Sequence, residues 1–245
     1  AFPLLFLVLF NLLFEGTIGT AGRSGSLTVI QFYAPSLAVF AAASATYTNL
    51  AVGTAIARDQ GILKRFRGTP LPPASYLAGR VGSAMWIAVV AVVLMLGVGV
   101  AAYGLEIRTA TLAAAIVTFL VGAACFASLG VAVAGIARTG DAAPALANFT
   151  ILPLAFISDV FLPLESPPQW LATLADVFPL RHFARAFQDA FSPFTTGSGF
   201  RWGSLAVMGV WAVIGLLVAV RTFGWEPRAG GSSRRGRRAS PARGT

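Results

Sequence analysis

The sequence predicts an all-α integral membrane protein with six transmembrane helices, a short cytoplasmic helix after the second, and an external re-entrant helical hairpin before the last. Of the 245 residues, 56% are apolar and only 11% are charged, and the mean hydropathy is +0.76. Soluble domains carry about 25% charged residues. Five stretches of 17 to 34 residues contain no charged side chain, and the basic residues gather in the connections between them.

The charge-free stretches are long enough to cross a bilayer. A helix needs roughly 17–25 apolar residues to span the hydrocarbon core. Inside lipid the backbone N–H and C=O groups must bond within their own segment, so each stretch should be helical. We expect crossings at about 32–56, 81–102, 111–137, 143–162 and 202–221.

The first 14 residues, AFPLLFLVLFNLLF, are apolar but short. We expect them to be the first of six crossings, with its start missing. A signal-like or interfacial segment is the alternative, although the basic residues that begin a secretory signal are absent.

The basic residues predict the orientation. If connection 57–80 and the C-terminal tail share one side, that side holds thirteen Lys and Arg, against five on the other. The positive-inside rule places the side with thirteen in the cytoplasm. The C-terminus is therefore expected to be cytoplasmic. The preference for Arg over Lys and the abundance of Ala and Gly are typical of a high-GC bacterium, so we expect a multi-pass protein of a bacterial cytoplasmic membrane.

Composition divides the chain into two parts. We expect residues 1–225 to form one membrane domain and residues 226–245 to be a disordered, Arg-rich cytoplasmic tail that touches anionic lipid. The tail has neither the interleaved aromatic residues nor the fold that nucleic-acid binding requires. We therefore expect no nucleic-acid partner.

Two connections carry helical patterns. In the cytoplasmic one, Ile62, Leu63 and Phe66 share a helical face, and basic residues occupy the rest. This pattern fits a helix on the membrane surface or one that docks into a partner. The external connection, 163–200, holds two pieces of about 11 residues, too short to span, and predicts a re-entrant hairpin packed on protein. Connection 16–30 is a Gly/Thr/Ser-rich loop without periodicity.

The sequence lacks the motifs of metal clusters, nucleotide-binding sites and common hydrolase active sites. One cysteine, Cys125, and one histidine, His182, exclude a metal cluster. No phosphate-binding loop, HExxH or GxSxG motif occurs, so we expect no catalytic residue and no bound cofactor. Asp159 is the sole acid inside an apolar run and falls near its outer edge. Ion-coupled transporters usually keep ionisable residues at mid-membrane, so a partner ATPase is the economical energy source.

Uncharged polar residues do lie inside the predicted crossings. Thr46 and Asn49 share a face of the second crossing, and Asn148 and Thr150 lie in the fifth. Such side chains hydrogen-bond helices together in lipid. Alternatively, they line a translocation path.

Two motifs resemble the permease subunit of ABC type-2 exporters, the family of bacterial daunorubicin-type drug-efflux and polysaccharide-export permeases. Residues 58–71, RDQGILKRFRGTPL, resemble its R-x-x-G-T-L-x-R-L-x-x-T-P-L segment. Residues 158–163, SDVFLP, resemble its S-G-x-x-x-P signature, with Asp159 where Gly is usual. The resemblance covers about residues 2–221, with six crossings in the same order.

The resemblance implies roles for both motifs. The cytoplasmic helix becomes a coupling helix, in which Leu63 and Phe66 insert into an ATPase cleft while Arg58 and Asp59 hold it against the crossings. Gly61 and Arg65 belong to the same segment. The outer motif implies an outer gate that comprises Ser158, Asp159, Phe161 and Pro163.

The resemblance also implies partners and a cargo. Two copies of an ABC ATPase, which bind ATP and Mg²⁺, would rock two permease copies, as a homodimer or a heterodimer, within membrane lipid. The path between the permeases would open alternately to the cytoplasm and to the outside, and it would export an amphipathic drug, lipid or glycan-type substrate. An ion-coupled secondary transporter or channel, and a membrane enzyme or scaffold without an ATPase, remain the alternatives.

Overall fold

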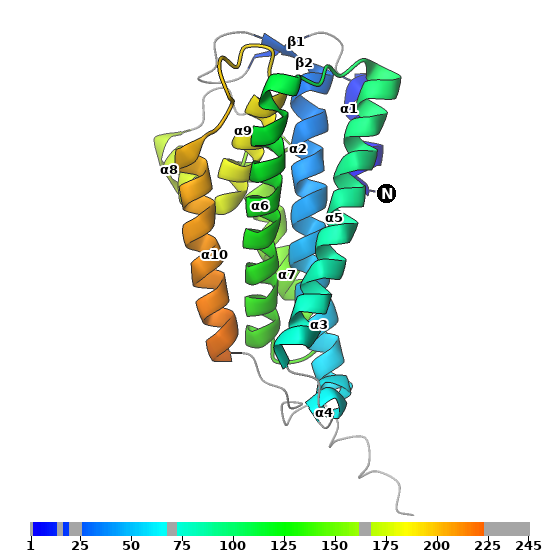
Figure 1. Cartoon of the computed structure of the whole chain (residues 1–245), viewed down its shortest axis with the longest axis vertical. Helices are drawn as coiled ribbons and strands as arrows, with labels where there is room; N and C mark the ends of the chain where they lie inside the picture. The colour runs from blue at the N-terminus through cyan, green and yellow to red at the C-terminus, as the bar shows by residue number, and fades with distance from the viewer. Residues whose placement is uncertain (1, 14–16, 20–25, 68–72, 162–167, 223–245) are drawn as a thin grey trace, which may run out of the picture.

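The computed structural model describes residues 2–13, 17–19, 26–67, 73–161 and 168–222 (Figure 1). The side chains of Phe66 and Arg67 are not described, although their backbone is helical. The predicted gate residue Pro163 and the predicted tail 226–245 lie outside the described residues.

Six apolar helical units form an elongated bundle (Figure 1). They are α1 (Phe2–Leu13), α2 (Val29–Ala43) continuing through η1 (Ser44–Thr48) into α3 (Asn49–Asp59), α5 (Pro73–Tyr103), α6 (Thr109–Ile136), α7 (Ala142–Ile157) and α10 (Trp202–Thr222). Four of them are long and apolar enough to cross a membrane: α2–α3, α5, α6 and α10. The described α1 and α7 are shorter apolar helices. The bundle fits the predicted all-α membrane protein, and the number of crossings stays a prediction.

Helix α7 ends earlier than the predicted crossing 143–162. Its 16 residues span about 24 Å, less than the roughly 30 Å hydrocarbon core. Ser158 and Asp159 form a turn instead of a further helical turn, and Asp159 has a positive φ of 57°. The left-handed conformation stops the helix at Ile157.

The α2–α3 unit lies at the centre of the bundle. In its most apolar window, 78% of the residues are buried inside the protein, because α1, α5, α6 and α9 all pack on it. A capping box starts it, in which the Thr28 and Gln31 side chains each accept a hydrogen bond from the other's backbone N–H. Five residues of π-helix, η1, connect its two halves.

The connections sort to the two ends of the bundle (Figure 1). Helix α4 (Ile62–Arg67) lies at one end. At the other lie β1 (Thr17–Gly19), β2 (Ser26–Thr28), α8 (Gln169–Val177) and α9 (Pro179–Phe191). The antiparallel β1–β2 pair, with Ile18 opposite Leu27, corrects the prediction of a loop without regular structure. Leu27 is buried, so packing against the bundle selects a pairing that the sequence pattern did not show.

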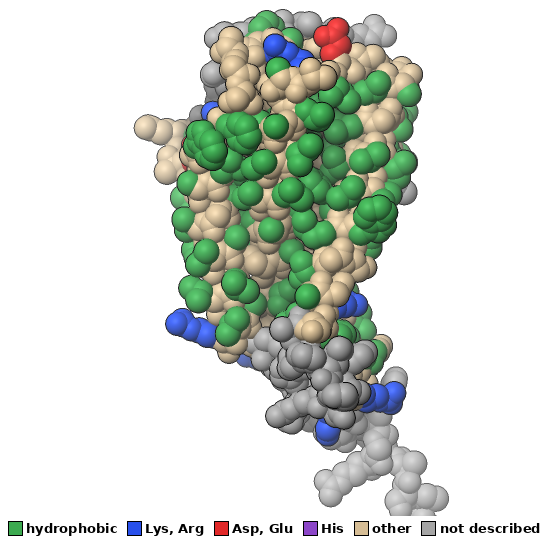
Figure 2. Space-filling view, in the orientation of Figure 1, with side chains coloured by type: hydrophobic (Ala, Val, Ile, Leu, Met, Phe, Trp, Pro, Cys, Tyr) green, Lys and Arg blue, Asp and Glu red, His purple; other side chains and the backbone are tan. Residues whose placement is uncertain are grey.

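The segment predicted to be an external hairpin forms two helices, α8 and α9, with different surroundings. On α9, Phe183, Phe187 and Phe191 are buried in the core, as their spacing predicts. On α8, Trp170 and Leu174 stay exposed, 68% and 43% respectively. Helix α9 is therefore part of the bundle, whereas α8 presents an apolar side outward. Figure 2 shows hydrophobic side chains along the wall of the bundle and basic side chains at both of its ends.

Candidate functional site

Two predicted pathway residues line one cavity. Asn49 of α3 and Asn148 of α7 belong to a cavity of about 580 Å³, which we call the α3–α7 cavity. Its remaining lining comes from the same helices and from α2 and η1: Phe40, Ser44, Thr48, Val52, Gly53, Ile151 and Leu152. Amide and hydroxyl groups therefore face apolar groups across one space.

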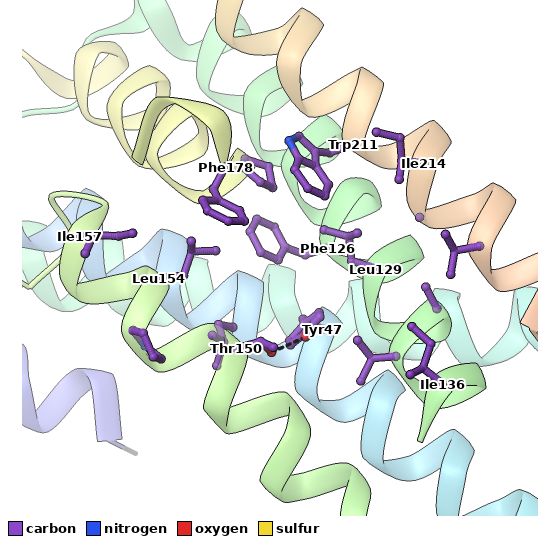
Figure 3. Close-up of a pocket in the computed structure, with 17 residues that line it drawn as sticks. Tyr47, Phe126, Leu129, Ile136, Thr150, Leu154, Ile157, Phe178, Trp211 and Ile214 are labelled. Atoms are coloured by element: carbon purple, nitrogen blue, oxygen red, sulfur yellow. Dashed lines mark hydrogen bonds between the residues drawn. The ribbon is translucent and has the colours of Figure 1, made fainter. Parts of the chain in front are cut away.

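The other two predicted pathway residues lie elsewhere. The Thr46 side chain is fully buried, and its hydroxyl donates to the carbonyl oxygens of Ala42 and Ala43. The Thr46 hydroxyl is therefore satisfied by the backbone of its own helix, and the side chain lines neither of the two cavities. The Thr150 hydroxyl is 2.5 Å from the Tyr47 hydroxyl. That pair belongs to a second cavity (Figure 3).

The second cavity, the α7–α10 cavity, lies between α7 and α10 with α6 as its floor (Figure 3). Its volume is about 460 Å³, and its walls are almost entirely apolar. At one end the Phe178 and Trp211 rings stack, with centroids 5.9 Å apart, and Trp211 Nε1 donates to the Val177 carbonyl oxygen. The polar atoms of the labelled residues are thus bonded within the protein.

A thin wall separates the two cavities. Ile151 lines both of them, and the Tyr47–Thr150 hydrogen bond ties η1 to α7 beside it (Figure 3). The π-helical turn of η1 places Ser44 and Thr48 toward one cavity and Tyr47 toward the other. π-helical segments often occur at functional positions. Helix α7 is the shared wall.

The outer motif is built around Asp159. Its left-handed φ explains why Gly suits this position in the family pattern, since Gly adopts that conformation without strain. Asp159 accepts from Arg181 Nε at 3.3 Å and from Arg185 Nε and Nη2 at 3.0 and 2.8 Å, all through Oδ2. Its carbonyl oxygen accepts from Gln188. The carboxylate therefore fixes the end of α7 to α9.

Ser158 and Phe161 are both buried next to this anchor. Phe161 contacts the rings of Phe6, Phe40 and Phe156 at centroid distances of 5.7, 4.9 and 5.3 Å. Phe40 also lines the α3–α7 cavity. A cluster of aromatic rings thus covers the cavity at the end where the predicted outer gate lies.

Arg58 and Asp59 form a second anchor at the opposite end. The Arg58 guanidinium is 2% exposed and donates to the carbonyl oxygens of Ala134 and Ala137 at 2.8 Å each. Those carbonyls end α6, where a cation is favoured by the helix dipole. Asp59 accepts from Arg58 Nε and from the backbone N–H of Gly140. The pair fastens the end of α3 to the turn between α6 and α7.

The predicted cytoplasmic helix, α4, exposes other side chains than its pattern suggested. Gly61, with φ of 70°, separates α3 from α4. Leu63 is completely buried inside the chain, whereas Ile62, Lys64 and Arg65 are exposed. Leu63 thus packs on its own chain in this structure, and its insertion into an ATPase stays a prediction. The Phe66 side chain lies outside the described part.

Sequence reasoning missed the buried partners of the outer motif. Arg181 is 3% exposed and Gln188 is 1% exposed, and Gln188 also donates to Ser36 of α2. The signal available was an Arg inside the predicted amphipathic hairpin. A buried Arg requires a carboxylate partner, and Asp159 was the acid left inside an apolar run.

Comparisons with known proteins point to one family. The model of the family described as ABC-2 type transporter matches residues 1–192. The chain is 29% identical over 194 residues to the daunorubicin resistance ABC transporter permease protein DrrB1 of Streptomyces coeruleorubidus. That alignment covers 76% of this chain and 65% of the curated relative.

Proposed function

Because this chain belongs to the ABC-2 type transporter family, and is a multi-pass permease subunit of that family, we propose that it carries cargo outward across a bacterial cytoplasmic membrane, driven by a separate ATPase. The proposed cargo is an amphipathic drug, lipid or glycan-type molecule. The relative's name connects it with resistance to daunorubicin, which makes a drug the first cargo to test.

The α3–α7 cavity is the observation that carries this proposal. Asn49 and Asn148 are both exposed on the single chain, and Phe149 beside them is 77% exposed. An amide facing hydrocarbon is costly, so polar residues in membranes usually face protein or a water-filled cavity. We propose that a second permease copy covers this face, so that the Asn side chains line a path between two copies.

The two anchors supply the mechanics of the proposed cycle. The Arg58–Asp59 anchor connects α3 to the α6–α7 turn, and the Asp159 anchor connects α7 to α9. A push on α4 at one end would thus reach α7, the wall of the path. In the proposed alternating access, α7 would move relative to α2–α3 and separate Phe40 from Phe161.

The motor is proposed to be two ATPase subunits that bind ATP and Mg²⁺. They would contact α4 through its exposed residues Ile62, Lys64 and Arg65. The path would then open and close as those partners bind and hydrolyse ATP, with no cofactor on the permease itself.

An ion-coupled transporter or a scaffold is the competing function. Asp59 and Asp159 lie at the ends of apolar helices, and both are already hydrogen-bonded. Proton or ion coupling usually employs a carboxylate at mid-membrane. The location of these two acids therefore supports ATP-driven transport.

The test uses inside-out vesicles that contain the permease and its co-expressed ATPase, with daunorubicin as the probe. ATP should drive uptake. The double variant Asn49→Ala/Asn148→Ala should lower this uptake about tenfold, since each hydrogen bond to the cargo that is lost contributes about 0.5–1.5 kcal/mol. Asn11→Ala, on α1 and outside both cavities, is the matched control. Uptake driven by an ion gradient without ATP would favour the secondary transporter, and full uptake by the double variant would remove the cavity from the path.

A further inference from the structure

The α7–α10 cavity is suited to hydrocarbon and to little else. Its hydroxyl groups, Tyr47 and Thr150, bond to each other, and Thr150 also donates to the carbonyl oxygens of Leu146 and Ala147. The rest of the lining is apolar. Water gains no hydrogen bonds in such a space, and leaving it empty forfeits dispersion contacts along all of its walls.

The cavity opens sideways, where the bundle meets lipid. Ile136 and Ile214 line it, and they are 51% and 41% exposed. Its lining on α6, α7 and α10 falls within charge-free stretches. The opening therefore lies at hydrocarbon depth in a membrane.

Two basic side chains stand beside one end of this opening. Arg221 follows the lining residue Val218 by three positions, on nearly the same face of α10. Arg138 follows the lining residue Ile136 by two positions, just past the end of α6. The two helix ends touch, because a Cβ added to Gly135 would overlap Thr222. Both Arg side chains are exposed, and neither forms an ion pair with a carboxylate of the described residues.

We propose that the α7–α10 cavity is a phospholipid site, in which one acyl chain lies along α6 and the lipid phosphate binds Arg138 and Arg221. Val218 and Arg221 are about 4.5 Å apart along the helix axis, which matches the step from the first methylene groups of a lipid to its phosphate layer. Guanidinium groups bind phosphate with paired, charge-assisted hydrogen bonds. An anionic phospholipid gains further from the surrounding basic charge.

The bound lipid has a mechanical consequence. Its acyl chain would pack against Leu154 and Ile157 of α7, on the opposite side from the α3–α7 cavity. The lipid would thereby brace the wall that the cargo path requires. This inference rests on the membrane location of the chain and not on the proposed cargo or on ATP.

The experiment is native mass spectrometry of the purified full chain, titrated with dioleoyl phosphatidylglycerol. Ile214→Trp fills the opening, and Val213→Trp, exposed and outside the lining, is the matched control. We expect Ile214→Trp to weaken lipid binding tenfold or more, because each methylene group kept out of the cavity costs about a factor of four. Val213→Trp should bind like the unmodified chain.

The charge arm uses Arg138→Gln/Arg221→Gln, with the exposed Arg65→Gln of α4 as control. The double variant should lose about thirtyfold in affinity, since each basic residue near an anionic headgroup contributes about a factor of five. Glycerophosphoglycerol, the headgroup without acyl chains, should not bind measurably. Equal lipid binding by Ile214→Trp and Val213→Trp, or binding of the headgroup alone as tight as that of the lipid, would overturn the proposal. Displacement of the lipid by daunorubicin would assign the cavity to cargo instead, and would also overturn it.

Discussion

Asp159, just past the end of α7, and Arg181, near the start of α9, form an ion pair that is almost completely buried. Their side chains are 9% and 4% exposed, and Arg181 Nε lies 3.3 Å from Asp159 Oδ2. Arg181 also pairs with the more exposed Asp176 at 3.0 Å and donates to the Ala172 carbonyl oxygen. Asp159 thus holds α9 to α7, the helix that lines both cavities.

Removing the carboxylate should therefore destabilise the protein strongly. We expect Asp159→Ala to lower the free energy of unfolding by about 3–5 kcal/mol, because the buried Arg181 would lose its buried carboxylate partner. Thermal unfolding in detergent measures this loss. Asp176→Asn is the matched control and should cost about 0–1 kcal/mol, since Asp176 is 52% exposed. Similar losses in the two variants would contradict the anchor.

The anchor at the other end predicts a separate effect on coupling. Arg58→Ala should lower stability by about 3 kcal/mol, because two charge-assisted hydrogen bonds to the end of α6 are lost. It should also lower transport-coupled ATP turnover in the assembled complex. Lys64→Gln, exposed at the same end, should leave stability unchanged. A stable Arg58→Ala variant with normal turnover would show that the anchor transmits nothing.

The exposed side of α4 predicts which changes break contact with the ATPase. Ile62→Glu combined with Arg65→Glu should reduce partner-stimulated ATP turnover about tenfold or more, with the thermal midpoint of the permease preserved, since both side chains are exposed. Leu63→Ala should behave in the opposite way and cost about 2–5 kcal/mol of stability, because it empties a buried position. Unaltered turnover in the double variant would separate α4 from coupling.

Close helix packing gives a matched pair of glycine variants. A Cβ at Gly130 would lie 2.5 Å from the Tyr47 carbonyl oxygen, so Gly130→Ala should cost about 1–3 kcal/mol through overpacking. A Cβ at Gly97 meets no atom within 4 Å. Gly97→Ala should then stabilise the helix by about 0.5–1 kcal/mol. The difference in unfolding free energy between the two variants checks the packing of α6 on η1.

Much of the fold could be predicted because it depends on local chemistry. The charge-free stretches locate α2–α3, α6 and α10 to within three residues, whereas α5 begins at Pro73, eight residues before its predicted start. Such stretches predict helices because a chain in lipid must satisfy its own backbone. The same reasoning placed Asn49 and Asn148 among the polar residues of interest. It could not tell that Asn49 and Asn148 share a cavity, because periodicity does not identify the neighbour that a helix face meets. The prediction that Thr46 and Asn49 share a face was wrong, because the π-helical turn η1 interrupts the α-helical periodicity between them.

The sequence by itself determined where helices form and which segments avoid water, because hydrophobicity and backbone hydrogen bonding act over a few turns. Only the tertiary structure decided the partners across long separations: Arg58 on the end of α6, Arg181 and Arg185 on Asp159, and Gly130, but not Gly97, as a point of contact. It also buried Leu63 and exposed Ile62. These outcomes depend on which helix faces meet when the whole bundle packs. Tertiary packing of all the helices decides that, and no single segment does.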